Sequence, residues 1–459
     1  MQLLHKIVIL FLFLSILSGP YCWATTYYVD ATNGSDFNMG ISENAAWKTI
    51  RKAANIMTAG DTTYVKQGVY NERVHIEKSG SPNNSILYQA TGTVVTHGFT
   101  IKADFISVNG FEITDTINEW ADGAGIHIEG KHCQVTNNYI HDVTRVGIQI
   151  FAYPKDSYST SYCVIRDNRI EFAGLAGIEI YGRNNVIENN DISHILQYTP
   201  KWTNPPDWAD ADGIHFCGAG HIIRKNYIHH ILLSDKGNID PHIDHIQTFG
   251  PAYDIVFEQN FFEHTPVINN NYYQGAMVEQ IVEPVKNLTF RNNIFKNHIK
   301  LNFWGQSKNL YNVTIVNNTF IDPAGYAVEL HDCPNAKVVN NIFYYNSGNV
   351  RQYLWHDTSD GLEVDNNCYY VRDVHLAKRT EFLPRPSDLW QVDPKFVDVT
   401  CNNFKLRANS PLIDSGKILT EVFDDFNGIK RPEGSGWDIG AFEYKKILPP
   451  TNLDLSAIP

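Results

Sequence analysis

The chain has 459 residues, of which 43% are hydrophobic and 19% are charged, and its formal net charge at pH 7 is −13. The apolar content is enough for a continuous core, so a globally disordered chain is excluded. The negative charge argues against nucleic acid and against an anionic membrane surface as partners, because both attract basic proteins. An anionic polysaccharide stays open as a partner if a metal ion bridges the two.

The N-terminus predicts a signal peptide over residues 1–24. Lys6 gives a basic start, residues 7–18 form an apolar run, and Ala24 is a small residue suited to cleavage. The run is too short to span a bilayer comfortably, and no later segment could cross a membrane. The alternative is a lipoprotein anchored through Cys22. We expect a monomer that is secreted, to the extracellular space or the periplasm, without membrane insertion.

One short pattern recurs through most of the chain: an apolar residue, two variable residues, Asn, one variable residue and a second apolar residue. Its spacing varies from 22 to 36 residues, which predicts a coil of fixed size with loops of different length. The asparagines are Asn109, Asn138, Asn168, Asn190, Asn226, Asn260, Asn293, Asn318, Asn341 and Asn367. A second strand-like pattern, Gly-Ile-polar-apolar, follows in several units, as in residues 125–128 and 213–216. These repeats predict an all-β parallel β-helix with coils over residues 71–395.

Stacked coils bring equivalent residues of successive units side by side, and this makes the register testable. The asparagines should form a hydrogen-bonded ladder at one turn. Cys133 and Cys163 should be neighbours, either as a disulfide or, as we favour, as two buried thiols. One column should alternate in charge, and its members are Arg166, Glu188, Arg224, Glu258 and Arg291. Another should be an internal aromatic stack of Phe262, Phe295, Phe320 and Phe343.

The two ends of the coil predict caps. Residues 25–70 include the segment Trp47–Met57, whose apolar spacing is typical of an amphipathic helix that covers the first rung. An irregular C-terminal cap is expected over residues 396–445, followed by a tail or linker at 446–459. These segments resemble the opening and closing segments of secreted right-handed β-helix proteins of the pectate-lyase-like superfamily. The resemblance implies a right-handed coil but no single activity, because that superfamily includes lyases, hydrolases, epimerases and proteins without known catalysis.

The three longest spacings are consecutive, and their extra residues fall at 197–210, 232–242 and 265–275. Neighbouring insertions on one face would wall a groove. They contain Trp202, Trp208 and Tyr272, aromatic residues that could stack on sugars or serve in packing.

The strands beneath these insertions are unusually polar. Aligning residues 210–216 with 242–248 puts Asp210 beside His242, Asp212 beside Asp244 and His215 beside Gln247. Two carboxylates on adjacent strands cannot both ionise cheaply without a cation or a shared proton, so they suit acid–base chemistry or Ca²⁺ binding. The outward column is predicted as Glu179, His215, Gln247, Glu279, Asn302 and Glu329, with Asp240 and Trp304 near it.

We therefore expect a carbohydrate-active protein that cleaves a polysaccharide, as a lyase or a glycoside hydrolase, in a groove over residues 179–304. The predicted catalytic residues are Asp212, Asp244, His215, His245 and Glu279; the predicted substrate-binding residues are Glu179, Trp202, Trp208, His242, Gln247, Tyr272, Asn302 and Trp304; and the predicted metal ligands are Asp210 and Asp240, with Ca²⁺ as the possible cofactor. No Lys or Arg stands out at the centre, so a lyase would use His215, His245 or a loop lysine such as Lys201 or Lys236. The alternative is a non-catalytic glycan-binding or cell-surface β-helix.

Three weaker patterns complete the prediction. Asp212-Gly213-Ile214 and Asp244-His245-Ile246 resemble, in placement, the aspartate strands of β-helical polygalacturonases, but Ile243 stands where those enzymes have an acid. Asp240-Pro241-His242 resembles a tripeptide of β-helical mannuronan epimerases. A further column of His194, His230 and His264 is expected to be a packing ladder at a turn, with metal binding as the alternative.

Overall fold

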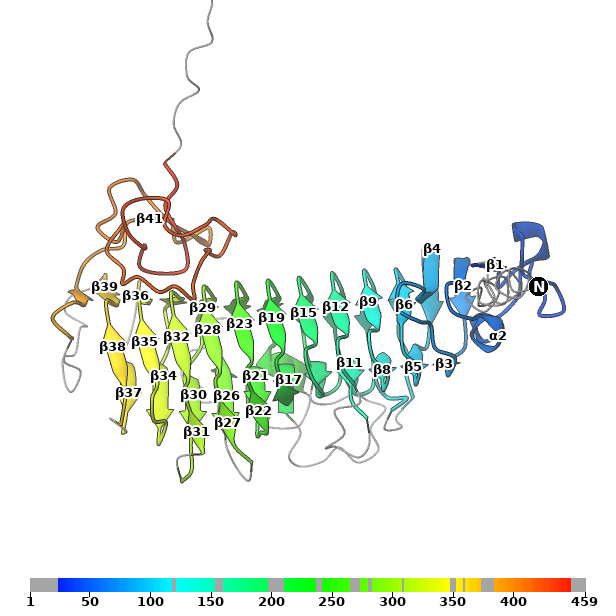
Figure 1. Ribbon diagram of the computed structural model, residues 1–459, viewed down its shortest axis with the longest axis horizontal. Coiled ribbons are helices and arrows are strands. Elements are labelled where there is room, and N and C mark those ends of the chain that lie inside the picture. Colours follow the sequence, from blue (N-terminus) through cyan, green and yellow to red (C-terminus); the bar gives the residue numbers. More distant parts are fainter. Residues whose placement is uncertain are drawn as a thin grey trace, which may run out of the picture.

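The computed structural model describes residues 24–446 except 118–120, 153–159, 197–209, 237–241, 265–272, 280–282, 308, 347–351, 358–359 and 373–383. The predicted signal peptide, the C-terminal tail from residue 447 and most of the three insertions therefore lie outside the described residues. Short parallel strands follow one another along a single elongated coil, from the N-terminal strands at one end to β38 and β39 at the other (Figure 1). The chain is a parallel β-helix, as the repeat predicted.

One sheet carries the Gly-Ile strands, each paired in parallel with its counterpart in the next rung. Its strands are β3 (Val74–Ile76), β5 (Phe99–Ile101), β8 (Ile126–Ile128), β11 (Val146–Ile150), β14 (Ala176–Ile180), β17 (Asp210–Phe216), β21 (His242–Thr248), β25 (Tyr273–Gln274), β26 (Ala276–Glu279), β30 (Leu301–Trp304), β34 (Tyr326–His331) and β37 (Gln352–His356). A smaller sheet stands beside it, made of β18 (Gly218–Ala219), β22 (Ala252–Tyr253), β27 (Val285–Lys286) and β31 (Leu310–Tyr311).

The Asn-containing pattern supplies two strands to each rung, one on each side of the Asn turn. The strands before the turn are β6 (Ile106–Asn109), β9 (Gln134–Thr136), β12 (Val164–Arg166), β15 (Val186–Glu188), β19 (Ile222–Arg224), β23 (Val256–Glu258), β28 (Thr289–Arg291), β32 (Thr314–Val316), β35 (Lys337–Val339) and β38 (Glu363–Asp365). The strands after it are β7 (Glu112–Ile113), β10 (Tyr139–His141), β13 (Arg169–Glu171), β16 (Asp191–Ser193), β20 (Tyr227–His229), β24 (Phe261–Glu263), β29 (Ile294–Lys296), β33 (Thr319–Ile321), β36 (Ile342–Tyr345) and β39 (Cys368–Val371).

The predicted asparagine ladder is present and buried. Asn168 Nδ2 donates to Asn190 Oδ1 over 3.0 Å, and the same oxygen accepts the Asn168 backbone N–H over 3.1 Å. The pattern repeats from Asn138 to Asn341. The residue before each ladder Asn has φ between 51° and 59°, a left-handed conformation that the ladder's hydrogen bonds hold in place.

Asn109 is a correction to the predicted ladder. It pairs with Thr136, while Asn138 donates to the Val108 carbonyl and accepts from the Phe111 backbone N–H. The first unit is therefore offset by two residues, and the alternation of apolar and polar residues cannot reveal such an offset because it keeps every side chain on the same face.

The other predicted columns are confirmed. Arg166, Glu188, Arg224, Glu258 and Arg291 are successive in-register partners, and Arg224 Nε lies 3.0 Å from Glu188 Oε1. The phenylalanine rings stack with centroids 4.7 to 5.3 Å apart, and Tyr369 continues the stack. Cys133 and Cys163 are unbridged and fully buried, and the pKa of the Cys133 thiol is raised by its interaction with Cys163 and by burial.

At the N-terminus, β1 (Thr26–Val29), β2 (Thr62–Tyr70) and β4 (Ile86–Thr96) form the first parallel rungs, and η1 (Glu43–Ala45) lies between β1 and α2. The helix α2 spans Ile50–Ile56, which is shorter than the predicted segment because Thr49 caps it: Thr49 Oγ1 accepts the Lys52 backbone N–H over 3.1 Å. Its residues Ile50, Ala53 and Ala54 are buried in the core.

The C-terminal segment lies along the flank of the coil (Figure 1). It follows β40 (Leu389–Trp390) and contains the antiparallel pair β41 (Phe396–Asp398) and β42 (Asn403–Leu406). Leu412, Ile439 and Phe442 pack on outward apolar residues of the β29, β33 and β36 rungs. Asn292 and Asn317 donate to its backbone carbonyls over 2.9 and 3.0 Å. The segment therefore covers an apolar stripe on the side of the coil.

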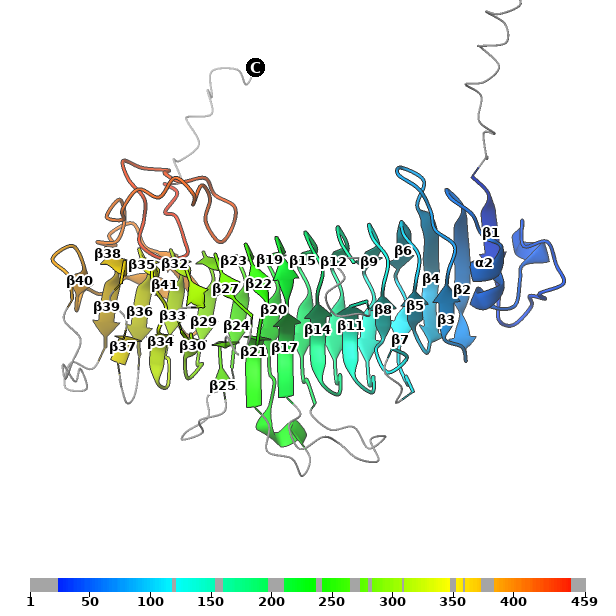
Figure 2. The same ribbon diagram turned by 60° about the horizontal axis from the view of Figure 1, so that its bottom comes forward.

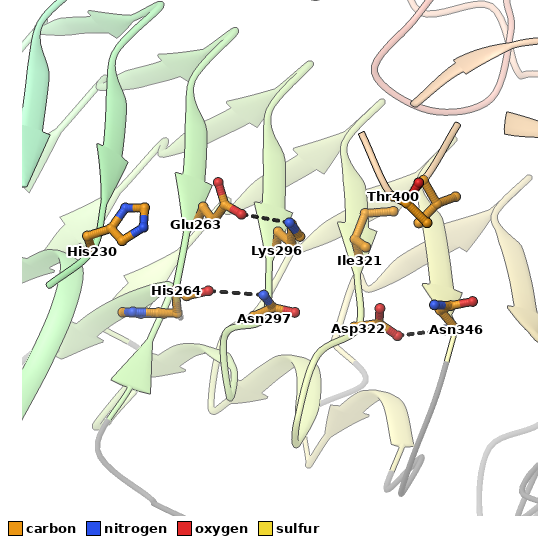
Figure 3. A pocket seen from close by; sticks show the side chains of 10 residues that line it. His230, Glu263, His264, Lys296, Asn297, Ile321, Asp322, Asn346 and Thr400 are labelled. Atoms are coloured by element: carbon orange, nitrogen blue, oxygen red, sulfur yellow. Dashed lines mark hydrogen bonds and ion pairs between the residues drawn. The ribbon is translucent and has the colours of Figure 1, made fainter. Parts of the chain in front are cut away.

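A pocket of about 310 Å³ lies where this segment meets the coil (Figure 3). Its charged groups are paired with each other: Lys296 Nζ donates to Glu263 Oε1 over 2.6 Å and to Asn402 Oδ1 over 2.7 Å. Asp322 Oδ1 accepts the Asn346 backbone N–H over 2.5 Å. The Lys296–Asn402 contact joins the coil to the C-terminal segment.

Candidate functional site

The register predicted for the polar strands is confirmed. Asp210 pairs with His242, Asp212 with Asp244 and His215 with Gln247 on β17 and β21, and Glu179 of β14 pairs with His215. Figure 2 shows β17 and β21 side by side, extending beyond the strands around them. Residues more than thirty positions apart in the sequence are thus brought to one face.

The two aspartates are buried at the start of these strands, in a column that contains Val146 and Ala176 before them and Gln274 of β25 after them. Gln247 Nε2 donates to Asp244 Oδ2 over 3.1 Å. His242 Nδ1 lies 3.5 Å from the same oxygen, and the His242 side chain is 37% exposed whereas that of Asp244 is fully buried. The same Nδ1 lies 3.1 Å from Met277 Sδ, so the partly exposed imidazole contacts both a thioether and a buried carboxylate.

A chain of polar side chains leads to His215 from the N-terminal side. His127 Nδ1 lies 2.7 Å from Gln149 Oε1, Gln149 Nε2 donates to Glu179 Oε2 over 2.5 Å, and Glu179 Oε1 lies 3.9 Å from His215 Nδ1. Burial lowers the pKa of His127. These contacts fix Glu179 and His215 in position on the outward face.

The position of Glu279 differs from the predicted outward column. Gln247 pairs with Met277, Met277 pairs with Asn302, and Glu279 pairs with Trp304. Glu279 is therefore on the predicted face but two residues further along the strand than predicted. The alternation of inward and outward residues cannot detect a shift of two residues, because such a shift keeps every side chain on the same face. Burial raises its pKa, while attraction to His242 and Lys300 partly offsets that rise.

His245 is a second correction, because its ring lies in the core. It is fully buried, and its ring centroid is 3.6 Å from that of His264. Burial and the neighbouring histidines lower its pKa well below the ordinary value. The facing residue is Gly213, where an added Cβ would lie 2.5 Å from Ile228 Cγ2, so this position points inward. His245 is thus a packing residue and not an exposed base.

The histidine column also differs from the prediction. His194 and His230 stack at their turn with centroids 6.1 Å apart, but His264 turns inward and stacks on His245. His264 Nε2 lies 3.1 Å from the Gln274 carbonyl oxygen, and burial lowers the pKa of His264 to about 4. Among the described residues, no group of three or more His, Cys, Asp or Glu could hold a metal ion.

Two positively charged side chains of the site were not predicted from the sequence. Lys300, just before β30, donates to Glu329 Oε2 over 2.7 Å and attracts Glu279. Arg145, just before β11, is attracted to Glu179, and burial lowers its pKa. Both immediately precede a strand that contributes to the site. The sequence offered that signal, but only the interactions with Glu329, Glu279 and Glu179 in the folded chain show that these side chains lie near the acids.

Several predicted site residues cannot be placed. Trp202, Trp208, Tyr272, Asp240 and Lys201 lie outside the described residues, as do the side chains of Asp210 and Lys236. Substrate contacts by the aromatic residues and Ca²⁺ binding by Asp210 and Asp240 therefore stay predictions.

Comparisons with known proteins agree with the architecture. Residues 155–369 match the family model of right-handed β-helix regions, and residues 74–198 match a family described as a protein of unknown function, DUF1565. The crystal structure of pectate lyase Pel9A is 17% identical, covers 91% of this chain and 96% of its own, and superposes with a TM-score of 0.55. The complex of XylC with xylose is 14% identical, with coverages of 92% and 99% and a TM-score of 0.53. The chain is thus a right-handed parallel β-helix with a pectate lyase-like fold.

A curated relative is less informative. The uncharacterised protein YwoF of Bacillus subtilis (strain 168) is 25% identical over 145 residues, a match that covers 28% of this chain and 30% of that protein. Within the described part of the chain, no helix has the length and hydrophobicity needed to cross a membrane.

Proposed function

We propose that this protein is a carbohydrate-active enzyme that cleaves a polysaccharide by acid–base catalysis on the outward face of β14, β17, β21, β26 and β30. The observation that carries the proposal is the contact between His242 and Asp244, a partly exposed imidazole 3.5 Å from a buried carboxylate. Such a carboxylate orients the ring and stabilises the imidazolium that forms when the ring accepts a proton.

The neighbouring Glu279 supplies the complementary group. Burial raises its pKa, so it keeps a proton to higher pH than an ordinary carboxyl group. The charge on His242 also acts on Glu279, which puts the two groups within electrostatic reach of each other. His242 thus serves as the base and Glu279 as the acid.

These roles favour β-elimination from a uronate-containing chain. His242 takes the C5 proton, the C4–O bond breaks, a C4–C5 double bond forms, and Glu279 protonates the departing oxygen. The uronate carboxylate needs a positive partner on this acidic face, and Lys300 and Arg145 are described cations there. Ca²⁺ is a further candidate, because the paired Asp212 and Asp244 with Gln274 offer the oxygen donors that it prefers.

Glycoside hydrolysis is the second candidate, and the Asp212–Asp244 pair favours it. Adjacent strands are about 4.8 Å apart, close to the roughly 5–5.5 Å between the carboxyl groups of retaining glycosidases. In this reaction the two aspartates would be the nucleophile and the acid–base, and His242 would position Asp244.

Product chemistry separates these reactions. The protein is incubated with polygalacturonate, alginate and xylan, and the products are followed by the absorbance of a C4–C5 double bond and by the number of reducing ends. New absorbance supports elimination, whereas reducing ends without it support hydrolysis. Binding without either product would favour the non-catalytic glycan-binding alternative and overturn the proposal.

A further inference from the structure

A column of aromatic rings continues the candidate site toward the C-terminal end of the coil. The rings of Trp304 and His331 stack with centroids 4.5 Å apart and an interplanar angle of 20°. His331 and Trp355 follow with centroids 4.3 Å apart. The strands that carry them, β30, β34 and β37, lie after β26 in the same row of strands (Figure 1). Of these three residues, only Trp304 was predicted from the sequence to contact the substrate.

The register joins this column to the acid of the proposed reaction. Trp304 pairs with His331 on one side and with Glu279 on the other. One face of the indole is covered by the imidazole, so the opposite side of the ring is toward the Glu279 rung. Trp304 is 44% exposed, which is high for so large an apolar side chain. An apolar ring is thus left accessible beside a carboxyl group.

Charged groups border the rings. His331 Nε2 lies 3.6 Å from Glu329 Oε2, which also accepts from Lys300 Nζ, and His331 Nδ1 lies 3.5 Å from Asp357 Oδ2. Sugar rings present apolar C–H faces and hydroxyl groups together. A site that combines an exposed aromatic ring with nearby charged hydrogen-bonding groups matches both features.

Stacking alone does not mark a binding site in this coil. Phe105, His132 and Tyr162 form a similar column, with centroids 4.6 and 5.0 Å apart, at the turns before β6, β9 and β12. Its members have φ between 55° and 59°, so it belongs to a repeated turn. The Trp304 column instead arises from strands that share a sheet with the candidate site, and it directly follows Glu279.

We propose that the indole of Trp304 binds a sugar ring of the glycan on the C-terminal side of the bond that reacts, through the ring face that His331 leaves free. His331 and Trp355 stack behind this indole, and the three residues are called the platform. The inference rests on the proposed function, because the glycan is the substrate of that site. Trp304 and Glu279 lie on adjacent strands, roughly 4.8 Å apart, so the bound sugar ring lies at the rung of Glu279.

The test is affinity electrophoresis of the full chain in native gels that contain polygalacturonate, alginate or xylan. The variants Trp304→Ala and Trp355→Ala are compared with Trp304→Phe, which keeps an aromatic ring, and with Tyr162→Ala, which removes a 52% exposed ring from the other column. We expect Trp304→Ala to bind about tenfold more weakly, the loss of roughly one ring–sugar contact. Trp355→Ala should weaken binding by a smaller factor, because it removes only the ring that supports His331. Trp304→Phe should lose less and Tyr162→Ala nothing, at unchanged melting temperatures.

The outcomes separate the platform from the catalytic proposal. If the wild type cleaves a polysaccharide and both alanine variants are retarded like the wild type, the platform is wrong and the catalytic proposal stands. If the alanine variants lose retardation but no polysaccharide is cleaved, the platform stands and the catalytic proposal fails. If no gel retards the wild type, or if Tyr162→Ala loses as much affinity as Trp304→Ala, the platform is overturned.

Discussion

Asp244 is fully buried, and its Oδ2 atom lies 3.5 Å from Nδ1 of His242, a side chain that reaches solvent. The same oxygen accepts a hydrogen bond from Gln247. Together these contacts give one carboxylate two neighbours, and Nδ1 of the imidazole also lies 3.1 Å from Met277 Sδ. All three residues lie on β21, so this single strand creates the arrangement.

Glu279 should set the alkaline limit of activity. Its raised pKa means that it loses its proton at a higher pH than an ordinary carboxyl group, and an acid catalyst stops working once that proton is lost. We expect the rate to fall as pH rises through the raised pKa. Glu279→Gln should lower kcat by about 10²-fold or more and remove this pH dependence. An unchanged pH profile in the variant would exclude Glu279 as the acid.

The asparagine ladder should dominate local stability. Asn293 receives two hydrogen bonds from Asn260 and donates to the Phe257 carbonyl and to Asn318. Asn293→Ala would leave buried polar groups without partners and should lower the free energy of unfolding by about 3 kcal/mol. Asn335→Gly, at an exposed turn where Asn335 Nδ2 donates to Asn312, is the control, because glycine tolerates the φ of 57° at this position. It should change the free energy of unfolding by less than about 1 kcal/mol. Equal effects in urea denaturation would contradict the ladder's role.

Buried histidines should make the coil sensitive to acid. Burial lowers the pKa of His264 to about 4 and that of His298 to about 3, from an ordinary value of 6.5. Since these groups are protonated in the unfolded chain below pH 6.5 but stay neutral in the folded protein, stability is complete above 6.5. It is lost as pH falls toward 4, by roughly 3 kcal/mol for each histidine.

Denaturation midpoints measured between pH 4 and 8 check this expectation. His264→Gln should weaken the pH dependence, although it also lowers stability at pH 8. His75→Gln changes an exposed histidine and should leave the dependence as it is. A wild-type midpoint that does not change from pH 7 to pH 4 would refute the account of these histidines.

The sequence was sufficient for the coil because each rung repeats the same chemistry. The Asp212–Asp244 and His215–Gln247 pairs follow from aligning two similar strands, and the structure confirms both. Glu279 and Asn109 were misplaced by two residues, because a shift of two preserves the inward and outward faces. His245 was misjudged for another reason: alternation predicts an outward side chain where the local backbone turns it inward.

The most direct test of the proposed chemistry compares initial rates of His242→Asn and Asp244→Asn with the wild type on the polysaccharide that the wild type cleaves. A matched pair on another sheet supplies the controls: His229 Nε2 lies 2.8 Å from Asp191 Oδ1, so His229→Asn and Asp191→Asn remove the same chemistry elsewhere. We predict a loss of about 10²-fold or more for the first two variants and rates near wild type for the controls. Wild-type rates in folded His242→Asn and Asp244→Asn would contradict the account.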